Sequence, residues 1–326
     1  MKRFNNILLV LDPATPCASL VERAAAVAEN NQANLKIVAV VPQLVLASGL
    51  PPDGPVTMDL QARVVTDQTD KLEALAAPLR ERLSIGTKVL TGTAFLEVIR
   101  EVLRGAHDLV IRAAENPGWL DRLLGSDDMH LLRKCPSPVW LVRCEAPTPY
   151  RRILAAVDVD DSYAPDELAT RHALNREVLE LASALALSEF AELHVASAWD
   201  AIGEGFLRGA FMHTSDDAVA AYVEHSRQRN ARSLDVLMEE LTEFLGKDAV
   251  GYLEPKTHLV KGSARREIPA LVAQLEVDLV VMGTVARTGI PGLIMGNTAE
   301  AILEQLDCSV LAIKPPGFVT PVSLQD

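Results

Sequence analysis

Aromatic residues are scarce in this sequence, and long apolar runs are missing. Phe, Trp and Tyr make up only 4% of the 326 residues, whereas 49% are hydrophobic. The cores must therefore be built mainly from aliphatic side chains, which is typical of parallel strands buried on both faces. No stretch of about 18 apolar residues occurs, so we expect no membrane-spanning helix.

Closely spaced cysteines are also lacking. Cys17, Cys135, Cys144 and Cys308 are scattered, with no C-x-x-C pair. We therefore expect free thiols in a reducing compartment, which favours a cytoplasmic location. The first apolar run is interrupted by Asp12 and is too short for a signal peptide, so it predicts a strand.

Positive charge is in deficit. The chain has 31 Lys and Arg against 44 Asp and Glu, a formal net charge of −13. This argues against general binding of DNA or RNA, which requires basic surface to neutralise phosphates. The sequence also contains no G-x-S-x-G, H-E-x-x-H or Walker A motif, so the common signatures of hydrolases, zinc peptidases and P-loop enzymes do not apply.

What the sequence does contain is an internal repeat. Three pairs of segments resemble each other: 4–12 and 150–158, 89–111 and 259–281, and 135–143 and 306–314. The repeat predicts two domains, 1–146 and 150–326, joined by the Pro-rich segment 144–152.

Each half reads as strands that alternate with helices. In the second half the expected strands lie near 152–158, 191–198, 256–261, 278–282 and 309–313. The expected helices lie near 165–187, 215–245, 264–275 and 297–306. This alternation predicts an α/β fold of two tandem, doubly wound parallel-sheet domains.

A candidate anion site lies near the end of the second half. Gly283 closes an apolar strand, and Gly296-Asn297-Thr298 opens the next helix. Ligands of open parallel sheets bind at the carboxyl ends of strands, where glycine lets the backbone approach closely. The free N–H groups of a helix start suit a phosphate. The same residues could instead form only a turn and a helix cap.

The segment resembles the nucleotide motif of the universal stress protein family: glycine, two residues, glycine, nine residues, glycine and a small polar residue. Gly283, Ala286, Gly296 and Asn297 stand at these positions, with alanine in place of the second glycine. Because the repeat covers both halves, almost the whole chain resembles a bacterial tandem universal stress protein. The resemblance implies that family's fold, which is like that of the adenine nucleotide alpha hydrolases.

The resemblance also implies a cytoplasmic stress-response protein that binds ATP, ADP or AMP in its second domain and is regulatory rather than strongly catalytic. By this resemblance, Asp158 corresponds to the family's aspartate near the ribose and adenine. Val195 corresponds to the family's strand residue whose backbone contacts the adenine. The site residues that it implies are Val157, Asp158, Val195, Met282, Gly283, Ala286, Gly296, Asn297 and Thr298. Whether Mg²⁺ accompanies the nucleotide stays open.

Family members commonly pair the last strands of two domains. In this chain 138–143 and 309–314 could pair in that way, giving an intramolecular pseudo-dimer, with a further homodimer left open. Two other functions stay open. One is a slow ATPase, and the other is a carrier of an apolar small molecule with the loop 201–214 as its gate.

The first half departs from the motif. Ala113 stands where the second half has Gly283, Asn116 replaces Ala286, and Asp127 and Asp128 follow Gly125-Ser126. Two carboxylates stabilise a helix start but repel a phosphate. We expect that this half does not bind nucleotide in the same way and instead serves packing, an interface or a different ligand.

Asp127, Asp128 and His130 could also be metal ligands. A charged helix start is the favoured interpretation, because a structural zinc site usually needs four N or S ligands. We therefore assign no metal site.

Overall fold

The computed structural model describes residues 4–13, 17–44, 54–114, 126–201, 203–208, 215–284 and 295–324. Two compact units divide the chain. The first comprises Met1–Thr148, Cys308–Lys314 and Phe318–Asp326, and the second comprises Pro149–Asp307 and Pro315–Gly317. None of the helices in these described ranges is long and apolar enough to cross a bilayer.

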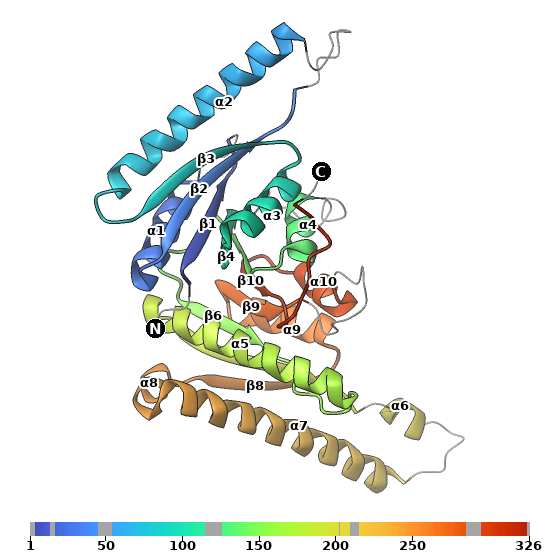
Figure 1. The fold of residues 1–326 in the computed structure, drawn as a ribbon. Coiled ribbons are helices and arrows are strands. Elements are labelled where there is room, and N and C mark those ends of the chain that lie inside the picture. The colour runs from blue at the N-terminus through green and yellow to red at the C-terminus, as the bar shows by residue number, and fades with distance from the viewer. Residues whose placement is uncertain are drawn as a thin grey trace. The chain divides into compact units, whose positions relative to one another are not determined.

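The first unit contains a sheet with the strand order β3-β2-β1-β4-β5-β10 (Figure 1). Its elements are β1 (Asn6–Leu11), α1 (Ala18–Asn31), β2 (Asn34–Val41), α2 (Pro55–Ala76), η1 (Ala77–Leu79), β3 (Ile85–Thr91), α3 (Ala94–Gly105), β4 (Leu109–Ala113), α4 (Asp127–Lys134), β5 (Val139–Val142) and β10 (Ser309–Ile313). All pairs are parallel except that of β10 with β5.

The strands of this unit follow from their apolar runs. In β1 every residue after Asn6 is buried, because β2 and β4 pair with its two edges and the helices α1 and α3 pack against it. From β1 the chain winds outward to β2 and β3 and then returns to β4. The winding direction therefore changes between β1 and β4, which is where open α/β sheets form a crevice at the carboxyl ends of their strands.

The second unit repeats the pattern with the strand order β9-β6-β7-β8, all parallel (Figure 1). Its elements are β6 (Arg152–Ala156), α5 (Pro165–Glu189), β7 (Glu192–Trp199), α6 (Glu204–Leu207), α7 (Asp216–Leu245), α8 (Lys247–Leu253), β8 (Lys256–Lys261), α9 (Ala264–Gln274), β9 (Leu279–Gly283) and α10 (Asn297–Leu303). The expected fold class of two tandem, doubly wound α/β domains is confirmed.

The two closing strands pair as the sequence predicts. β10 runs antiparallel to β5, with Val310 opposite Leu141, Leu311 opposite Trp140 and Ala312 opposite Val139. Arg143 N–H also donates to Ser309 Oγ at 3.0 Å. The last strand of the second repeat therefore belongs to the compact unit of the first.

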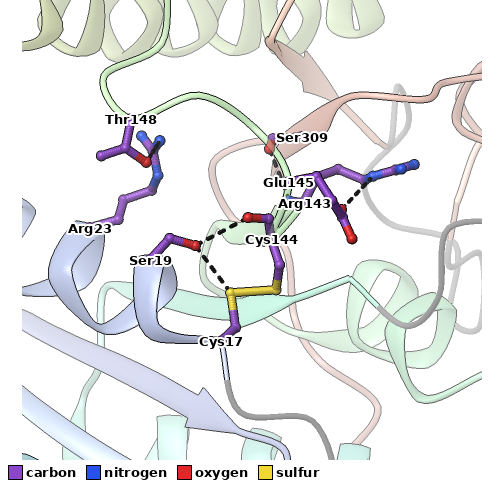
Figure 2. The surroundings of a disulfide bond; sticks show 8 residues. All are labelled: Cys17, Ser19, Arg23, Arg143, Cys144, Glu145, Thr148 and Ser309. Atoms are coloured by element: carbon purple, nitrogen blue, oxygen red, sulfur yellow. Dashed lines mark hydrogen bonds and ion pairs between the residues drawn. A yellow bond between two sulfur atoms is a disulfide. The ribbon is translucent and has the colours of Figure 1, made fainter.

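A disulfide joins Cys17, immediately before α1, to Cys144, two residues after β5 (Figure 2). The expectation of free thiols is wrong for this pair, while Cys135 and Cys308 are not in a disulfide bond. The two partners are 127 residues apart in sequence, and only the folding of β1, β4 and β5 into one sheet brings them together. Because disulfides persist in oxidising surroundings, the cysteines no longer favour a reducing compartment.

Hydrogen bonds reinforce the disulfide (Figure 2). Ser19 Oγ donates to the Cys144 carbonyl at 3.3 Å. One turn later, Arg23 Nη2 donates to the Pro147 carbonyl at 2.7 Å and to Thr148 Oγ1 at 2.9 Å. The segment that leaves β5 is thus fixed to α1 by a covalent bond and three hydrogen bonds.

Candidate functional site

The predicted nucleotide residues centre on the carboxyl ends of β6 and β9. These strands pair in parallel up to Ala156 and Met282, so both end at the same edge of the sheet. Asp158 follows β6, and Gly283 is the last residue of β9. The structure therefore brings the predicted aspartate and the first glycine of the motif to one edge.

Gly296 lies at the same edge. Its N–H donates to the Thr284 carbonyl at 2.9 Å, which joins the start of α10 to the end of β9. Ala286 lies outside the described residues, but the two glycines at the ends of the motif are shown to converge. Gly296 is the N-cap of α10, and no side chain caps the helix. Asn297 and Thr298, the first residues of the helix, are both exposed, and Gly296 is half-buried.

This arrangement leaves a helix start open to an anion. The N–H groups of a first helical turn have no partner within the helix, and the positive end of the helix dipole lies there. Gly296 N–H already donates to the Thr284 carbonyl. A phosphate would therefore accept hydrogen bonds from the N–H groups of the residues that follow Gly296. The residue types at the start of α10 fit a phosphate group.

Gly283 has a packing role that the sequence does not reveal. A Cβ at this position would lie 2.4 Å from Leu174 Cδ2 and 2.9 Å from Leu174 Cγ. The backbone of Gly283 is not in the left-handed region. Any larger residue here would force the Leu174 side chain of α5 to shift, whether or not a ligand approaches.

Asp158 is held by neighbours from α5. Asn175 accepts a hydrogen bond from Asp158 N–H at 3.0 Å and donates one to the Asp158 carbonyl at 2.7 Å. The carboxylate forms an ion pair with Arg171, whose guanidinium carbon lies 3.5 Å from the centre of the Tyr163 ring. Burial raises the pKa of Asp158, and the cation of Arg171 opposes this rise.

Two other predicted residues have buried side chains. Val195 lies in β7, paired with Ala155 and Thr257, and its side chain is fully buried. Met282, the residue before Gly283 at the end of β9, is also buried. Only the backbones of these two residues could therefore face a ligand at this edge.

The pairing of β6 with β7 extends just past the end of β6. Ala156 pairs with Ala196, and Val157 N–H donates to the Ala196 carbonyl at 2.9 Å. Beyond Val157 the chain leaves β7, since Asp158 N–H donates to Asn175 of α5.

The possible metal ligands of the first half have separate partners. Asp128 forms an ion pair with Arg112 at 3.2 Å, and both side chains are buried. Asp127 accepts a hydrogen bond from Phe95 N–H at 3.3 Å, while the ring of His130 stacks on that of Phe95 with centroids 4.3 Å apart. Within the described ranges no three His, Cys, Asp or Glu side chains converge on a metal site.

Several expectations fall on residues that the structure does not describe. These are Asn116 and Gly125 in the first half, and residue 202 and residues 209–214 of the proposed gate. The described part of that gate contains α6, in which the side chain of Phe206 is 68% exposed.

The family model for the universal stress protein family matches residues 3–143 and 149–314, nearly the entire chain. The fold and the two repeats agree with this match, and the protein belongs to the universal stress protein family. It is similar to universal stress protein E of Escherichia coli K12, with 30% identity over 100% of this chain and 99% of that protein. It is also similar to universal stress protein E of Photorhabdus laumondii, with 27% identity over 99% of this chain and 98% of the relative.

Solved structures support the same fold. A putative universal stress protein from Pseudomonas aeruginosa UCBPP-PA14 superposes with a TM-score of 0.70 at 25% identity, covering 96% of this chain and 94% of that one. A universal stress protein from Archaeoglobus fulgidus gives a TM-score of 0.59 at 14% identity, covering 95% and 96% of the two chains. Both neighbours span the two repeats, so the tandem architecture occurs in other proteins.

Proposed function

We propose that this member of the universal stress protein family binds one adenine nucleotide (ATP, ADP or AMP) in its second unit and acts as a regulatory stress-response protein in the cytoplasm. The observation that carries the proposal is the hydrogen bond from Gly296 N–H to the Thr284 carbonyl. It brings the start of α10 to the carboxyl edge of β9, beside the strand that leads to Asp158.

In the proposed complex the phosphates lie at the start of α10, against the amides and polar side chains of Asn297 and Thr298. The nucleoside lies towards Asp158, whose carboxylate is partly exposed, with 41% of the side chain accessible. On β7 the backbone of Val195 meets the adenine. The rest of the proposed site is formed by the backbone of Val157, Met282, Gly283, Ala286 and Gly296.

Binding rather than turnover is the proposed activity. The Asp158 carboxylate is paired with Arg171 and accepts a hydrogen bond from Asp160 N–H at 3.2 Å. A carboxylate engaged in this way is suited to orienting a hydroxyl group rather than removing a proton. Slow ATP hydrolysis would need groups beyond this aspartate, and Mg²⁺ would enter with the nucleotide.

The test uses a difference in charge at one helix start: α4 of the first repeat begins with two aspartates, whereas α10 of the second begins with Asn297 and Thr298. Isothermal titration calorimetry with ATP, ADP and AMP on the full chain should show binding to the wild type. Thr298→Asp introduces at the start of α10 the carboxylate that Asp127 supplies to α4. It should weaken binding by about tenfold or more, since like charges repel, without lowering stability, because acidic residues favour helix starts.

Thr298→Ser is the matched control, since it keeps a hydroxyl and adds no charge. It should bind nucleotide like the wild type. Unchanged affinity in Thr298→Asp would place the phosphates elsewhere. The absence of heat with all three nucleotides, confirmed by equilibrium dialysis at millimolar concentration, would reject the proposal.

A further inference from the structure

Two histidines face each other on neighbouring strands of the second unit. His194 lies in β7 and His258 in β8, and His194 Nδ1 is 2.9 Å from His258 Nε2. Their ring centres are 5.1 Å apart, which is close to this distance plus the radii of the two rings. The two nitrogens therefore point at each other along one line, and only one proton fits between them. This geometry suits a hydrogen bond and not a shared metal ion, towards which both lone pairs would have to turn.

The outer nitrogen of His194 sets the direction of this hydrogen bond. His194 Nε2 is 3.6 Å from Glu192 Oε2, and the His194 side chain is buried. A carboxylate attracts an N–H group and repels a lone pair, so His194 carries its proton on Nε2. His194 Nδ1 is then the acceptor, and His258 Nε2–H is the donor. In the neutral pair each ring is thus protonated on Nε2.

The pair can take up one further proton but not two. His258 Nδ1 is the nitrogen left without a proton, and its side chain is half-buried. Protonation there leaves the bond to His194 in place. A second added proton would have to enter between the rings, where two N–H groups would then oppose each other. The hydrogen bond between the histidines is therefore lost when both rings are charged.

The surroundings oppose positive charge on the pair. Burial is the largest cause that lowers the pKa of both histidines. His258 and Lys256 lower the pKa of His194 further, whereas Glu192 raises it. Lys256 likewise lowers the pKa of His258. Glu192 does not balance the pair alone, because its carboxylate also accepts a hydrogen bond from Lys256 Nζ at 2.8 Å.

The first unit has two lysines at the equivalent positions. Lys36 lies two residues after the start of β2, as His194 does in β7. Lys88 of β3 and His258 of β8 each pair with the residue two positions further along the neighbouring strand. Both units therefore place two basic side chains on the same face of adjacent strands, since alternate residues of a strand share a face.

Only the lysines have a buried counter-charge. Glu101 of α3 is 1% exposed and accepts hydrogen bonds from Lys36 at 2.5 Å and from Lys88 at 2.7 Å. Because segment 89–111 corresponds to segment 259–281, the equivalent residue in α9 is Leu271. A second positive charge on the histidines would therefore lack the carboxylate that the lysines have.

The helix over the histidines supplies no other anion at this level. α9 leads the chain from β8 back to β9, as α3 leads it from β3 back to β4. Right-handed crossovers place such a helix on the face opposite α5 and α7. The charged residues of α9, Arg265, Arg266 and Glu267, are confined to its first turn, and Ile268–Gln274 is uncharged.

We propose that His194 and His258 form an acid-sensitive latch, which holds the edge strand β8 on β7 and loosens it when the pair takes up protons. Among the described strands β8 pairs with β7 alone, so this side-chain bond spans the single pairing that holds it. Acidification is thereby converted into opening of β8. The latch contains no nucleotide ligand, and the proposal does not depend on nucleotide binding.

Hydrogen–deuterium exchange of the full chain between about pH 7.5 and pH 5, corrected for intrinsic rates, tests the latch. Below about pH 6.5 the open strand binds more protons than the closed one, so protection of β8 falls by up to about tenfold per pH unit for each proton. Protection of β3, where Glu101 balances the two lysines, should not follow this course.

Two variants separate titration from packing. His194→Asn combined with His258→Gln replaces both rings with amides that can still form a hydrogen bond but do not titrate. In this double variant the protection of β8 should no longer depend on pH. His225→Gln, which removes an exposed histidine of α7 in the same unit, is the control and should keep the wild-type dependence.

The wild type alone also decides the question, whether or not the double variant folds. Long-range ¹H–¹⁵N spectra should show both rings protonated on Nε2 at neutral pH and titrating below about 6.5, the pKa of free histidine. Titration of both rings at or above that value would overturn the proposal. So would protection of β8 that is flat with pH in the wild type, or a pH dependence that the double variant retains.

Discussion

Leu174 of α5 occupies the space that a side chain at position 283 would need. Its Cδ2 atom would lie only 2.4 Å from a Cβ at Gly283. A residue that the family resemblance predicts to contact phosphate therefore also sets how closely a helix packs on the sheet. The two roles of Gly283 can be separated by experiment.

Gly283→Ala should destabilise the protein by about 1–3 kcal/mol, because the added methyl overpacks the contact with Leu174. The cost should fall in a Leu174→Ala background, where the space is open. Urea unfolding of the four proteins of this double-mutant cycle measures the coupling. Gly296→Ala is the control and should cost less, since its nearest contact would be the Thr284 carbonyl at 3.8 Å. Equal costs of Gly283→Ala in both backgrounds would contradict the packing explanation.

The disulfide predicts a second measurable effect. Reduction, or the double change Cys17→Ser and Cys144→Ser, should lower the free energy of unfolding by about 2–5 kcal/mol, because the cross-link restricts the unfolded chain. In a Cys308→Ser background, reduction should lower the free energy of unfolding by the same amount, since Cys308 is not part of the disulfide.

Alkylation provides a direct check of the same bond. Under denaturing, non-reducing conditions, mass spectrometry should find two labelled cysteines, Cys135 and Cys308. After reduction it should find all four. Four labels without reduction, together with stability that a dithiol does not change, would show that the bond is not formed in the protein.

Lys314 predicts a pH dependence. Its amine is buried and donates to the Leu132 carbonyl, and burial lowers its pKa to about 7 from 10.5. Above about pH 7 the folded chain has lost this proton while the unfolded chain retains it. Because the unfolded state then binds more protons, Lys314 makes stability rise with pH, by at most about 1.4 kcal/mol per pH unit.

The thiol of Cys135 sets the upper limit of the pH range in which this rise in stability can be measured. Burial raises the pKa of Cys135 to about 12 from 9.0, so above about pH 9 this group makes stability fall with pH. Urea unfolding between about pH 7 and pH 9 should therefore show a steeper rise for the wild type than for Lys314→Met. Lys71→Met, on the exposed face of α2, should keep the wild-type slope. Equal slopes for the wild type and Lys314→Met would contradict the assignment.

Much of the fold could be predicted from the sequence because it depends on local patterns. Apolar runs separated by amphipathic segments predict parallel strands, and the repeat predicts two such domains. The pairing of β5 with β10 is an expectation from the family resemblance. The disulfide could not be predicted in this way, since Cys17 and Cys144 are 127 residues apart and meet only through the order of the strands.

The candidate site was predictable to a similar extent. The motif correctly indicates that Gly283 and Gly296 lie together, because it reflects a strand end followed by a helix start. It does not indicate that Leu174 packs against Gly283. That contact depends on packing between segments distant in the sequence.

The stoichiometry of nucleotide binding tests the central claim most directly. Native mass spectrometry of the full chain with AMP and ATP should show one nucleotide per chain for the wild type and none for Thr298→Asp under the same conditions. Two nucleotides per chain, or one that Thr298→Asp retains, would contradict the account by placing nucleotide outside the start of α10.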